Sequence, residues 1–500
     1  MADTTRRNLL KAAALLPLAA TCGGFARARG RSLIGASTDA PTQARFAVDT
    51  TRSGRRVSDT LAGLSYETLQ LSDPAFFSPD NRALVELFRG LSPHGVLRIG
   101  GNTSDYTIWS GYRGEVPVQH AHKGGPQQPF VLKPEALHAL AGFLRATGWK
   151  LVFGVNLKIG VPVMAVELAR AVQQIVGDSL LAIQIGNEAN NYEADYAAFE
   201  TAWAPYAEAI RAAGVPIGGP DSGANTDWVI AYAQRHGRQN VFLSRHYYRD
   251  AAPKGSIPDL LGGDPAFLGE VEQIMRATDA ARLPFHLSEA NSYYFGGRDG
   301  VSNVFASALW GADFMLALAQ RGVAGIQFHG GTLESVEASL GRDADTGAAG
   351  TDLAARRNAV SSRYSAIAGD VALGFQPRPL YYGIALAQQF AGAHMLHGKL
   401  DAGGANLGAY AALREGGLQL ALINKDAGRD AAVSVSGLKD FGAGRLMRLS
   451  APSLDSRQGL VFEGLAGNAG AGHSIRTEGG TCRVALPRGS AAWIRLDRTV

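Results

Sequence analysis

The chain has 500 residues, of which 46% are hydrophobic and 18% are charged. This composition is that of an ordinary globular protein with a large core, and the length allows two or three domains, although a barrel of about 250 residues can form one. Loss of residues 1–28 would take the 48 basic and 44 acidic residues to 44 and 43, because four basic residues and one aspartate lie there. The resulting net charge of +1 does not indicate a general surface for polyanions, and we predict no nucleic-acid partner.

Residues 1–28 have the pattern of a twin-arginine export signal. Arg6-Arg7 precedes an apolar stretch, 12–20, that is too short to span a bilayer, and Ala26-Arg27-Ala28 offers a cleavage site. We therefore predict an exported protein, periplasmic or secreted, with no membrane span. Cys22 leaves with the signal, so Cys482 has no partner and the mature chain relies on its core for stability.

From residue 58 onward, short apolar runs alternate with longer amphipathic segments. Apolar residues recur at helical spacing over 134–148 and 303–322, and both segments end at a glycine. Eight β-then-α units favour a (β/α)8 TIM barrel over 58–385, in which functional residues lie at the carboxyl ends of the strands. The predicted strands are 61–66, 95–100, 150–156, 180–186, 214–219, 240–246, 283–289 and 322–329.

The pattern changes near residue 386. From there to residue 500, short alternating strands are separated by turns, which is typical of a β-sandwich. The N-terminal segment 29–57 contains a stretch, 45–57, that is predicted to be a strand outside the barrel and to join the sandwich. The segment 333–372 is predicted to be a long loop on the active face, where long loops tend to be functional. The predicted fold class is α/β, a TIM barrel with a C-terminal β-sandwich domain.

Two glutamates end two of the predicted barrel strands. Glu188 closes the fourth strand and Glu289 the seventh, and in a closed barrel these two ends face each other across the mouth. Either glutamate alone is as often a helix cap or a surface charge as a catalytic group. A pair flanking one cleft is what glycoside hydrolysis needs, because one carboxyl group protonates the leaving oxygen while the other attacks the anomeric carbon, at a separation of about 5–5.5 Å in retaining enzymes.

The side chains beside the two glutamates suit these roles. His246 and Tyr248 alternate on the sixth strand and so point the same way, inward, where a tyrosine hydroxyl can hold Glu289 ionised. Asn187 precedes Glu188 and is placed to bind a sugar hydroxyl next to the reacting carbon. Since no cluster of histidine, cysteine or aspartate with metal-ligand spacing accompanies His246, we predict neither a metal nor another cofactor.

Four motifs in this order resemble glycoside hydrolase family 79, which holds heparanases and β-glucuronidases. The resemblance implies a barrel enzyme with a retaining mechanism, in which Glu188 is the acid/base and Glu289 the nucleophile. It runs over nearly the whole chain after the signal, and the four motifs together are specific where none alone is. They are LRIGGNTSDY (97–106), IGNEANNY (185–192), HYY (246–248) and LSEANSYYFGG (287–297).

The resemblance also implies how the sugar is held. The family binds the uronate carboxylate through backbone amides of a Gly-Gly pair after the nucleophile, together with a tyrosine. Gly296 and Gly297 match this pair, one residue further from the nucleophile than in the human-type heparanase motif, and Tyr364 is the candidate tyrosine. Glu67 and Asn102 match positions that contact the sugar from strands one and two.

The expected substrate contains β-linked glucuronic acid, as in heparan sulfate-like glycosaminoglycans. An enzyme that cuts inside such chains needs basic residues along an open cleft, and five basic residues follow strand ends here. One alternative is an exo-acting β-glucuronidase on plant or aryl glucuronides, with the 333–372 loop closing one side of the cleft; another is a carbohydrate-binding barrel without catalysis. The five basic residues are Lys158, Arg245 (which replaces the first histidine of the family's usual pair), Arg249, Lys254 and Arg298.

Overall fold

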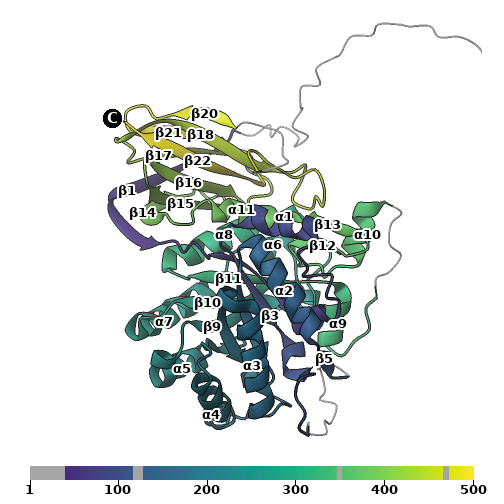
Figure 1. Ribbon diagram of the computed structural model, residues 1–500. Coiled ribbons are helices and arrows are strands. Elements are labelled where there is room, and N and C mark those ends of the chain that lie inside the picture. The colour runs from purple at the N-terminus through teal and green to yellow at the C-terminus, as the bar shows by residue number, and fades with distance from the viewer. Residues whose placement is uncertain (1–39, 116–127, 346–351, 466–471, 500) are drawn as a thin grey trace, which may run out of the picture. The chain divides into compact units, whose positions relative to one another are not determined.

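The computed structural model describes residues 40–115, 128–345, 352–465 and 472–499 (Figure 1). The predicted export signal, residues 1–28, lies outside these ranges, as do residues 29–39 of the predicted N-terminal segment. Within the described ranges, no helix combines the length and the apolar character that crossing a bilayer requires.

Eight parallel strands form a barrel, as the sequence predicts. Their hydrogen-bonded order is β7-β6-β3-β2-β11-β10-β9-β8, and a parallel bridge between Ile183 and Ile217 joins the two ends of this order. The predicted (β/α)8 fold is therefore confirmed. The strands are β2 (Ala62–Glu67), β3 (Val96–Gly100), β6 (Lys150–Val155), β7 (Leu180–Ile185), β8 (Gly219–Ser222), β9 (Leu243–Ala251), β10 (Phe285–Tyr294) and β11 (Gly325–Gly330).

The fifth and later strands differ in extent from their predictions. The fifth is predicted over 214–219, whereas β8 begins at Gly219, because Pro216 has no N–H for a ladder and Ile217 makes only the isolated bridge. This shift brings Asp221 into the strand, where it is buried. Strands β9 and β10 run about five residues past their predicted ends, which carries their last side chains out beyond the barrel.

Helices surround the barrel strands (Figure 1). Their first turns are capped as the sequence suggests: Asp195, Asn225 and Asp264 each accept a hydrogen bond from the N–H three residues further on. The helices are α1 (Arg82–Leu91), α2 (Pro134–Thr147), α3 (Pro162–Val176), α4 (Tyr196–Ala212), α5 (Thr226–His236), α6 (Ile257–Leu261), α7 (Pro265–Ala281), α8 (Phe305–Arg321), α9 (Leu333–Ser339), α10 (Leu353–Ala359) and α11 (Pro379–Gln388).

Short elements connect the barrel units. The 3-10 helices are η1 (Thr68–Ser72), η2 (Asn102–Tyr106), η3 (Gly177–Ser179), η4 (Ala189–Asn191), η5 (Gly237–Gln239) and η6 (Ala252–Lys254), and the two-stranded sheets are β4 (Thr107–Trp109) with β5 (Phe130–Leu132) and β12 (Ile367–Asp370) with β13 (Gly374–Pro377).

The C-terminal region forms a ten-stranded sheet, and the predicted N-terminal strand is part of it. Strand β1 (Thr42–Arg56) pairs antiparallel with β14 and parallel with β17. Alternate residues of strands from both halves of the sheet meet in one apolar core, as expected of a sandwich. The remaining strands are β14 (His394–Asp401), β15 (Leu407–Arg414), β16 (Gly417–Asn424), β17 (Ala431–Ser436), β18 (Phe441–Ser450), β19 (Val461–Phe462), β20 (His473–Arg476), β21 (Thr481–Leu486) and β22 (Ser490–Arg498).

Strand β16 shows why this sheet is so apolar. Leu420 and Leu422 point into the sandwich core, whereas Ala421 and Ile423, which alternate with them, belong to the large core of the barrel. Both faces of the strand are therefore buried, which explains a nearly continuous run of hydrophobic residues. Cys482 lies in the sandwich core as a free, buried thiol.

Two glycines within helices are predicted to respond oppositely to alanine. A Cβ at Gly383 of α11 would stand 2.2 Å from the carbonyl oxygen of Ala308 in α8, whereas a Cβ at Gly269 of α7 would meet nothing within 4 Å. Gly383→Ala should therefore lower the free energy of unfolding by about 1–3 kcal/mol through overpacking. Gly269→Ala should raise it by about 0.5–1 kcal/mol. Denaturant unfolding of the two variants checks this; a neutral Gly383→Ala would contradict the close α8–α11 packing.

Candidate active site

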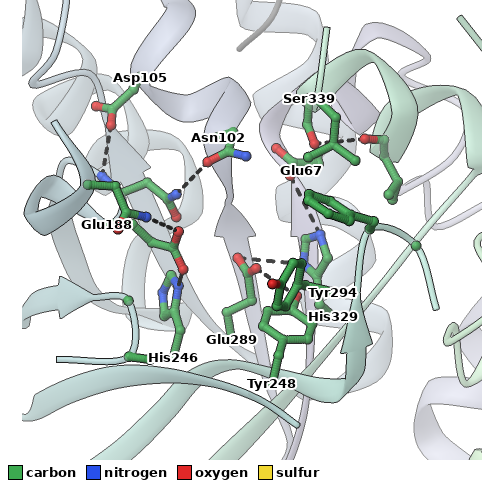
Figure 2. A pocket seen from close by; sticks show the side chains of 18 of the residues that line it. Glu67, Asn102, Asp105, Glu188, His246, Tyr248, Glu289, Tyr294, His329 and Ser339 are labelled. Carbon is green, nitrogen blue, oxygen red and sulfur yellow. Dashed lines mark hydrogen bonds and ion pairs between the residues drawn. The ribbon is translucent and has the colours of Figure 1, made fainter. Parts of the chain in front are cut away.

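A cavity of about 560 Å³ opens at the carboxyl ends of the barrel strands, and both predicted catalytic glutamates line it (Figure 2). Glu188 follows β7, and Glu289 lies within β10. The structure thus brings together two carboxylates that are 101 positions apart in the sequence. Their surroundings differ: the side chain of Glu188 is 24% exposed and that of Glu289 is 11% exposed.

Glu289 is held by donors that favour its ionised form. The Tyr248 hydroxyl donates to Oε1 at 2.7 Å, and Nη1 of Arg98 donates to Oε2 at 2.7 Å. Burial alone would raise the pKa of this carboxyl group, but His329, His246 and Arg98, together with the tyrosine hydrogen bond, hold it well below its usual range. Tyr248 keeps its proton, because burial and the Glu289 charge raise its pKa well above 10. A carboxylate of this kind can act as a nucleophile at neutral pH.

Glu188 occupies a strained position at the edge of the cavity. Its φ of 49° is in the left-handed region, which is uncommon for a residue with a side chain. The backbone N–H donates to the carbonyl of Asp221 at 2.9 Å, and Oε2 accepts from the Asn191 amide at 2.8 Å. The other oxygen, Oε1, lies 2.8 Å from Nδ1 of His246. One backbone and two side-chain contacts therefore fix this residue, and its carboxyl group lines the cavity.

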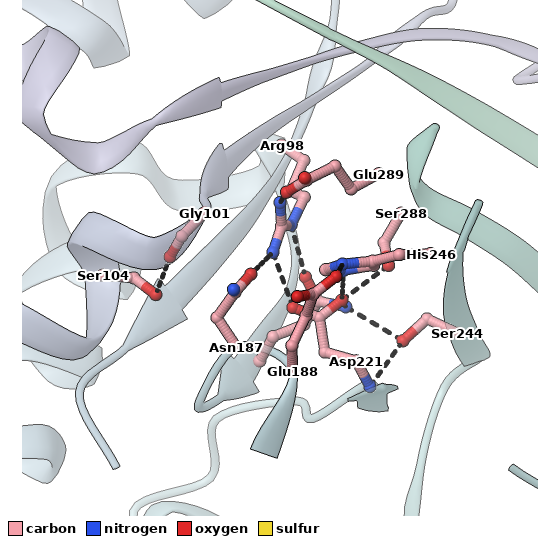
Figure 3. Close-up of polar contacts among 12 residues, drawn as sticks. Arg98, Gly101, Ser104, Asn187, Glu188, Asp221, Ser244, His246, Ser288 and Glu289 are labelled. Atoms are coloured by element: carbon pink, nitrogen blue, oxygen red, sulfur yellow. Dashed lines mark hydrogen bonds and ion pairs between the residues drawn. The ribbon is translucent and has the colours of Figure 1, made fainter. Parts of the chain in front are cut away.

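Beneath the two glutamates lies a buried ionic network that the sequence reasoning missed (Figure 3). Arg98 of β3 bridges Glu289 to Asp221, with Nη2 lying 2.6 Å from Oδ2 of Asp221. Burial disfavours the charged form of both groups, but their mutual attraction is stronger than this effect. The pKa of Arg98 is therefore raised and the pKa of Asp221 is lowered. Asp221 also accepts from Gln184 and Ser288. These bonds leave no carboxylate of the network unpaired.

His246 connects this network to Glu188. Its Nε2 lies 3.0 Å from Oδ1 of Asp221, while its Nδ1 faces Glu188. Burial lowers the pKa of this imidazole, but Asp221 and Glu289, together with the hydrogen bonds to Asp221 and Glu188, raise it to about 10. The ring is therefore protonated at neutral pH, and both nitrogens donate to carboxylates.

A second buried carboxylate, Asp105, organises the loops around Glu188 and was also missed. Its Oδ1 accepts from the N–H groups of Leu157 and Lys158, and its Oδ2 accepts from the N–H of Asn187 at 3.0 Å and the hydroxyl of Tyr192 at 3.2 Å. Burial raises the pKa of Asp105 to about 6, although these hydrogen bonds oppose the shift. The segments that follow three strands are thereby tied together next to Glu188.

Most of the predicted sugar-binding residues line the same cavity. Glu67 is buried, accepts from the N–H and hydroxyl of Thr103, and lies 3.6 Å from Nε2 of His329. Asn187 uses both ends of its amide, since its oxygen accepts from Arg98 and its nitrogen donates to Asn102. The lining includes Glu67, Asn102, Asn187, His246, Tyr248, Gly296 and Tyr364, but not Gly297.

The Gly296–Gly297 turn stands against Tyr364. Both glycines have left-handed φ values, 78° and 87°, and a Cβ on Gly297 would stand 2.7 Å from the backbone nitrogen of Tyr364. The carbonyl of Gly296 accepts from the N–H groups of Arg363 and Tyr364. Among the described residues, the N–H groups of the two glycines have no hydrogen-bond partner. The turn therefore presents unused amide donors beside a buried tyrosine at one end of the cavity.

Three of the five basic residues singled out from the sequence are in ion pairs. Arg245 pairs with Glu270, Arg249 with Asp259 and Lys254 with Asp250. Arg245 also donates to Thr226 and stacks over Phe267, so its side chain packs behind the barrel wall. Of the five basic residues singled out from the sequence, Lys158 alone lines the cavity.

The 333–372 segment forms part of the cavity wall. Instead of an unstructured loop, its described part contains α9, α10 and strand β12. Val336 and Ser339 of α9, and Leu340 after it, line the cavity. Residues 346–351 lie outside the described residues.

Comparisons with known proteins agree with the barrel and its C-terminal sheet. No family model matches the chain. A stretch of 67 residues is 45% identical to part of a β-glucuronidase of Neurospora crassa. This stretch is 13% of this chain and only 12% of the length of that protein. The solved structure of a 4-O-α-L-rhamnosyl-β-D-glucuronidase from Fusarium oxysporum, in complex with Rha-GlcA, matches with a TM-score of 0.68 at 18% identity, over 90% of this chain and 99% of that one.

A second solved structure has a similar fold, although the enzyme acts on a different sugar by its name. The GH51 arabinofuranosidase from Xanthomonas axonopodis pv. citri matches with a TM-score of 0.63 at 17% identity, over 91% of this chain and all of that one. At these identities the likeness establishes the architecture alone. The fold is thus the barrel with an additional sheet-rich domain that these glycoside hydrolases share.

Proposed function

We propose that this protein is a retaining β-glucuronidase, a glycoside hydrolase that cleaves glucuronic acid β-linkages by double displacement. The observation that carries the proposal is the pair Glu188 and Glu289 in one cavity, with surroundings that give them different roles. Glu289 is kept ionised by Arg98 and Tyr248, whereas Glu188 lies 2.8 Å from Nδ1 of His246, a proton donor from which it can take the proton that the leaving group needs. The short stretch shared with a β-glucuronidase and the fold shared with a rhamnosyl-glucuronidase support the same substrate class.

The proposed reaction has two steps. Oε1 or Oε2 of Glu289 attacks the anomeric carbon and forms an ester bond to it, while the bond to the leaving oxygen breaks. Glu188 delivers a proton to that oxygen, so the leaving group departs as an alcohol. Water then enters, Glu188 takes one of its protons, and the resulting hydroxide displaces Glu289 with a second inversion. The product is glucuronic acid with its original anomeric configuration.

The proposed site for the uronate carboxylate is the Gly296–Gly297 turn with Tyr364. Neutral amide and hydroxyl donors bind an anion without placing a full positive charge beside the oxocarbenium-like transition state, whose charge a cation would oppose. The unused N–H groups of the turn and the position of Tyr364 in the cavity wall support this assignment.

The proposal predicts strong discrimination at C6 of the sugar. A 4-nitrophenyl β-glucuronide should be hydrolysed with a kcat/KM at least about 100-fold higher than that of the matching β-glucoside, because the glucoside leaves the donors of the turn unpaired. Parallel assays on the two substrates test this. Comparable rates would remove the carboxylate site, and hydrolysis of neither substrate would favour a carbohydrate-binding barrel without catalysis.

The ion pairs around the cavity favour short glucuronides over long sulfated chains. A heparan sulfate chain would need several free cations along its path, but Arg245, Arg249 and Lys254 are already neutralised by acidic partners. The heparanase-type activity remains the second candidate, supported by the motif resemblance. Sizing the products of a heparan sulfate digest separates the two, because mid-sized fragments require internal cleavage and free monosaccharide requires cleavage at chain ends.

A further inference from the structure

Phe295 has an unusual backbone conformation that neither the fold nor the proposed chemistry explains. In the described part of the chain, four residues other than glycine have positive φ values. Arg282 ends α7 in a left-handed C-cap, which is a common helix ending. Glu188 and Asp221 belong to the catalytic network. Phe295, with φ 67°, is bulky and caps nothing, and such a residue in this region is a genuine outlier that costs stability.

The strained backbone holds an aromatic ring in solvent. Phe295 is 44% exposed and its neighbour Tyr294 is 38% exposed. They are the only aromatic residues among the exposed large hydrophobic side chains of the described ranges. A chain that bears strain in order to expose an apolar ring points to a binding role at that place.

Both rings lie at the mouth of the cavity. Tyr294 packs edge-on against Tyr248, whose hydroxyl holds Glu289, with ring centroids 6.2 Å apart (Figure 2). Phe295 in turn packs edge-on against Tyr294 at 4.6 Å. Both line the cavity, and the next residue is Gly296 of the proposed carboxylate site. The aromatic pair is therefore continuous with the space that would hold the glucuronyl ring.

Polar groups border the aromatic pair. The Arg342 guanidinium lies 5.4 Å from the Phe295 ring centroid and is itself bonded to Glu337 at 2.7 Å. Ser339 lines the same part of the cavity, beside the apolar Val336 and Leu340. A flat apolar surface with hydrogen-bonding groups at its edge matches a pyranose ring, which has an apolar C–H face and hydroxyls around its rim. Ser339 donates its hydroxyl proton to the carbonyl of Val336 at 2.8 Å and so can still accept a hydrogen bond from a sugar hydroxyl, which an aryl group lacks.

We propose that Tyr294 and Phe295 form a second sugar subsite, which stacks the pyranose ring adjacent to the reacting glucuronyl residue. The inference rests on the proposed glucuronidase function and narrows its substrate class to glucuronides attached to a further sugar. Phe295, which directly follows β10, thus serves substrate selection, and the reaction centre itself is formed without it.

The test compares substrates with and without a second ring. Methyl β-glucuronide has none. A glucuronyl-β-galactose disaccharide has one, on the leaving-group side, and a trisaccharide with a further sugar on its glucuronyl unit has one on each side. For Phe295→Gly we expect the ratio of kcat/KM for at least one oligosaccharide to that for methyl β-glucuronide to fall about tenfold, mostly through KM. Phe295→Tyr should keep the wild-type ratio. A fall for both oligosaccharides places the subsite on the leaving-group side of the glucuronyl ring, and a fall for the trisaccharide alone places it on the opposite side.

Stability separates this role from a structural one. Because glycine adopts positive φ freely, the Tm of Phe295→Gly should equal or exceed that of the wild type. Arg282→Gly, which relieves a left-handed residue on the far end of α7, is the matched control and should leave all the kinetic ratios unchanged. An unchanged ratio in Phe295→Gly, or a lowered Tm with equal losses on every substrate, overturns the subsite. Failure of the wild type on every glucuronide would instead overturn the proposed function.

Discussion

Glu289→Gln is expected to abolish turnover of every β-glucuronide, with a fall in kcat of about four orders of magnitude or more. The amide cannot form the ester to the anomeric carbon, and its NH2 group would face a donor, since Arg98 and Tyr248 both donate to this side chain. The readouts are kcat on an activated aryl glucuronide and the intact mass after reaction with a 2-fluoro-glucuronyl fluoride. The wild type should gain the mass of one glycosyl group and the variant none.

The two readouts guard against a trivial explanation. If Glu289→Gln is inactive because it is unfolded, its circular dichroism and Tm will show this, and Glu289→Asp then serves as a second variant that keeps the charge but shortens its reach. Residual turnover above about 1% of the wild type in a folded Glu289→Gln protein would assign the nucleophile elsewhere.

Glu188→Gln should lose activity in proportion to the help that the leaving group needs. The dinitrophenolate of a dinitrophenyl glucuronide departs without a proton, so the first step of its hydrolysis should slow about tenfold or less. The methoxide of methyl β-glucuronide is a poor leaving group without a proton, so the hydrolysis of this substrate should slow by about 10³-fold. Azide should restore turnover of the dinitrophenyl substrate, because it attacks the glycosyl-enzyme without a general base. Rates for a series of leaving groups of graded acidity measure this, and equal losses across the series would deny Glu188 the acid role.

Several features of the fold and site could be predicted from local pattern. The barrel follows from eight apolar runs separated by amphipathic helices, because each period is set by backbone geometry within a few residues. The positions of Glu188 and Glu289 follow from the same reading, since strand ends share one face of a barrel. The contact between Tyr248 and Glu289 was predicted from two-residue alternation on the sixth strand.

Arg98 and Asp221 could not be placed in this way. Both lie in short strands. Arg98 is 191 positions from Glu289 and 123 positions from Asp221, and sequence spacing carries no information over such separations. One signal was available: a charged residue within an apolar strand must be paired when it is buried. The run GVLRIG therefore called for a carboxylate partner. Which carboxylate it would be depends on how the barrel closes, and that is a tertiary property.

The ion pairs of Arg245, Arg249 and Lys254 show the same limit from the other side. Arg245 and Arg249 lie within β9 and Lys254 lies just after it, on the element that carries His246 and Tyr248 into the cavity, so each is expected to face the substrate. Their acidic partners come from neighbouring helices or from the same loop, and the geometry of those segments decided the outcome. The position of a basic residue along a strand predicts that it lies near the site, but it does not predict whether its charge is free to bind a substrate.

In the proposed reaction, His246 holds the proton that Glu188 passes to the leaving group. An ionised aspartate offers no hydrogen, so Nε2 carries one toward Asp221, and the protonated ring also carries one on Nδ1 toward Glu188. The proposal thus makes the imidazolium the source of the proton and Glu188 the group that relays it to the departing alcohol. The proton stays on the barrel wall until the scissile oxygen gathers negative charge.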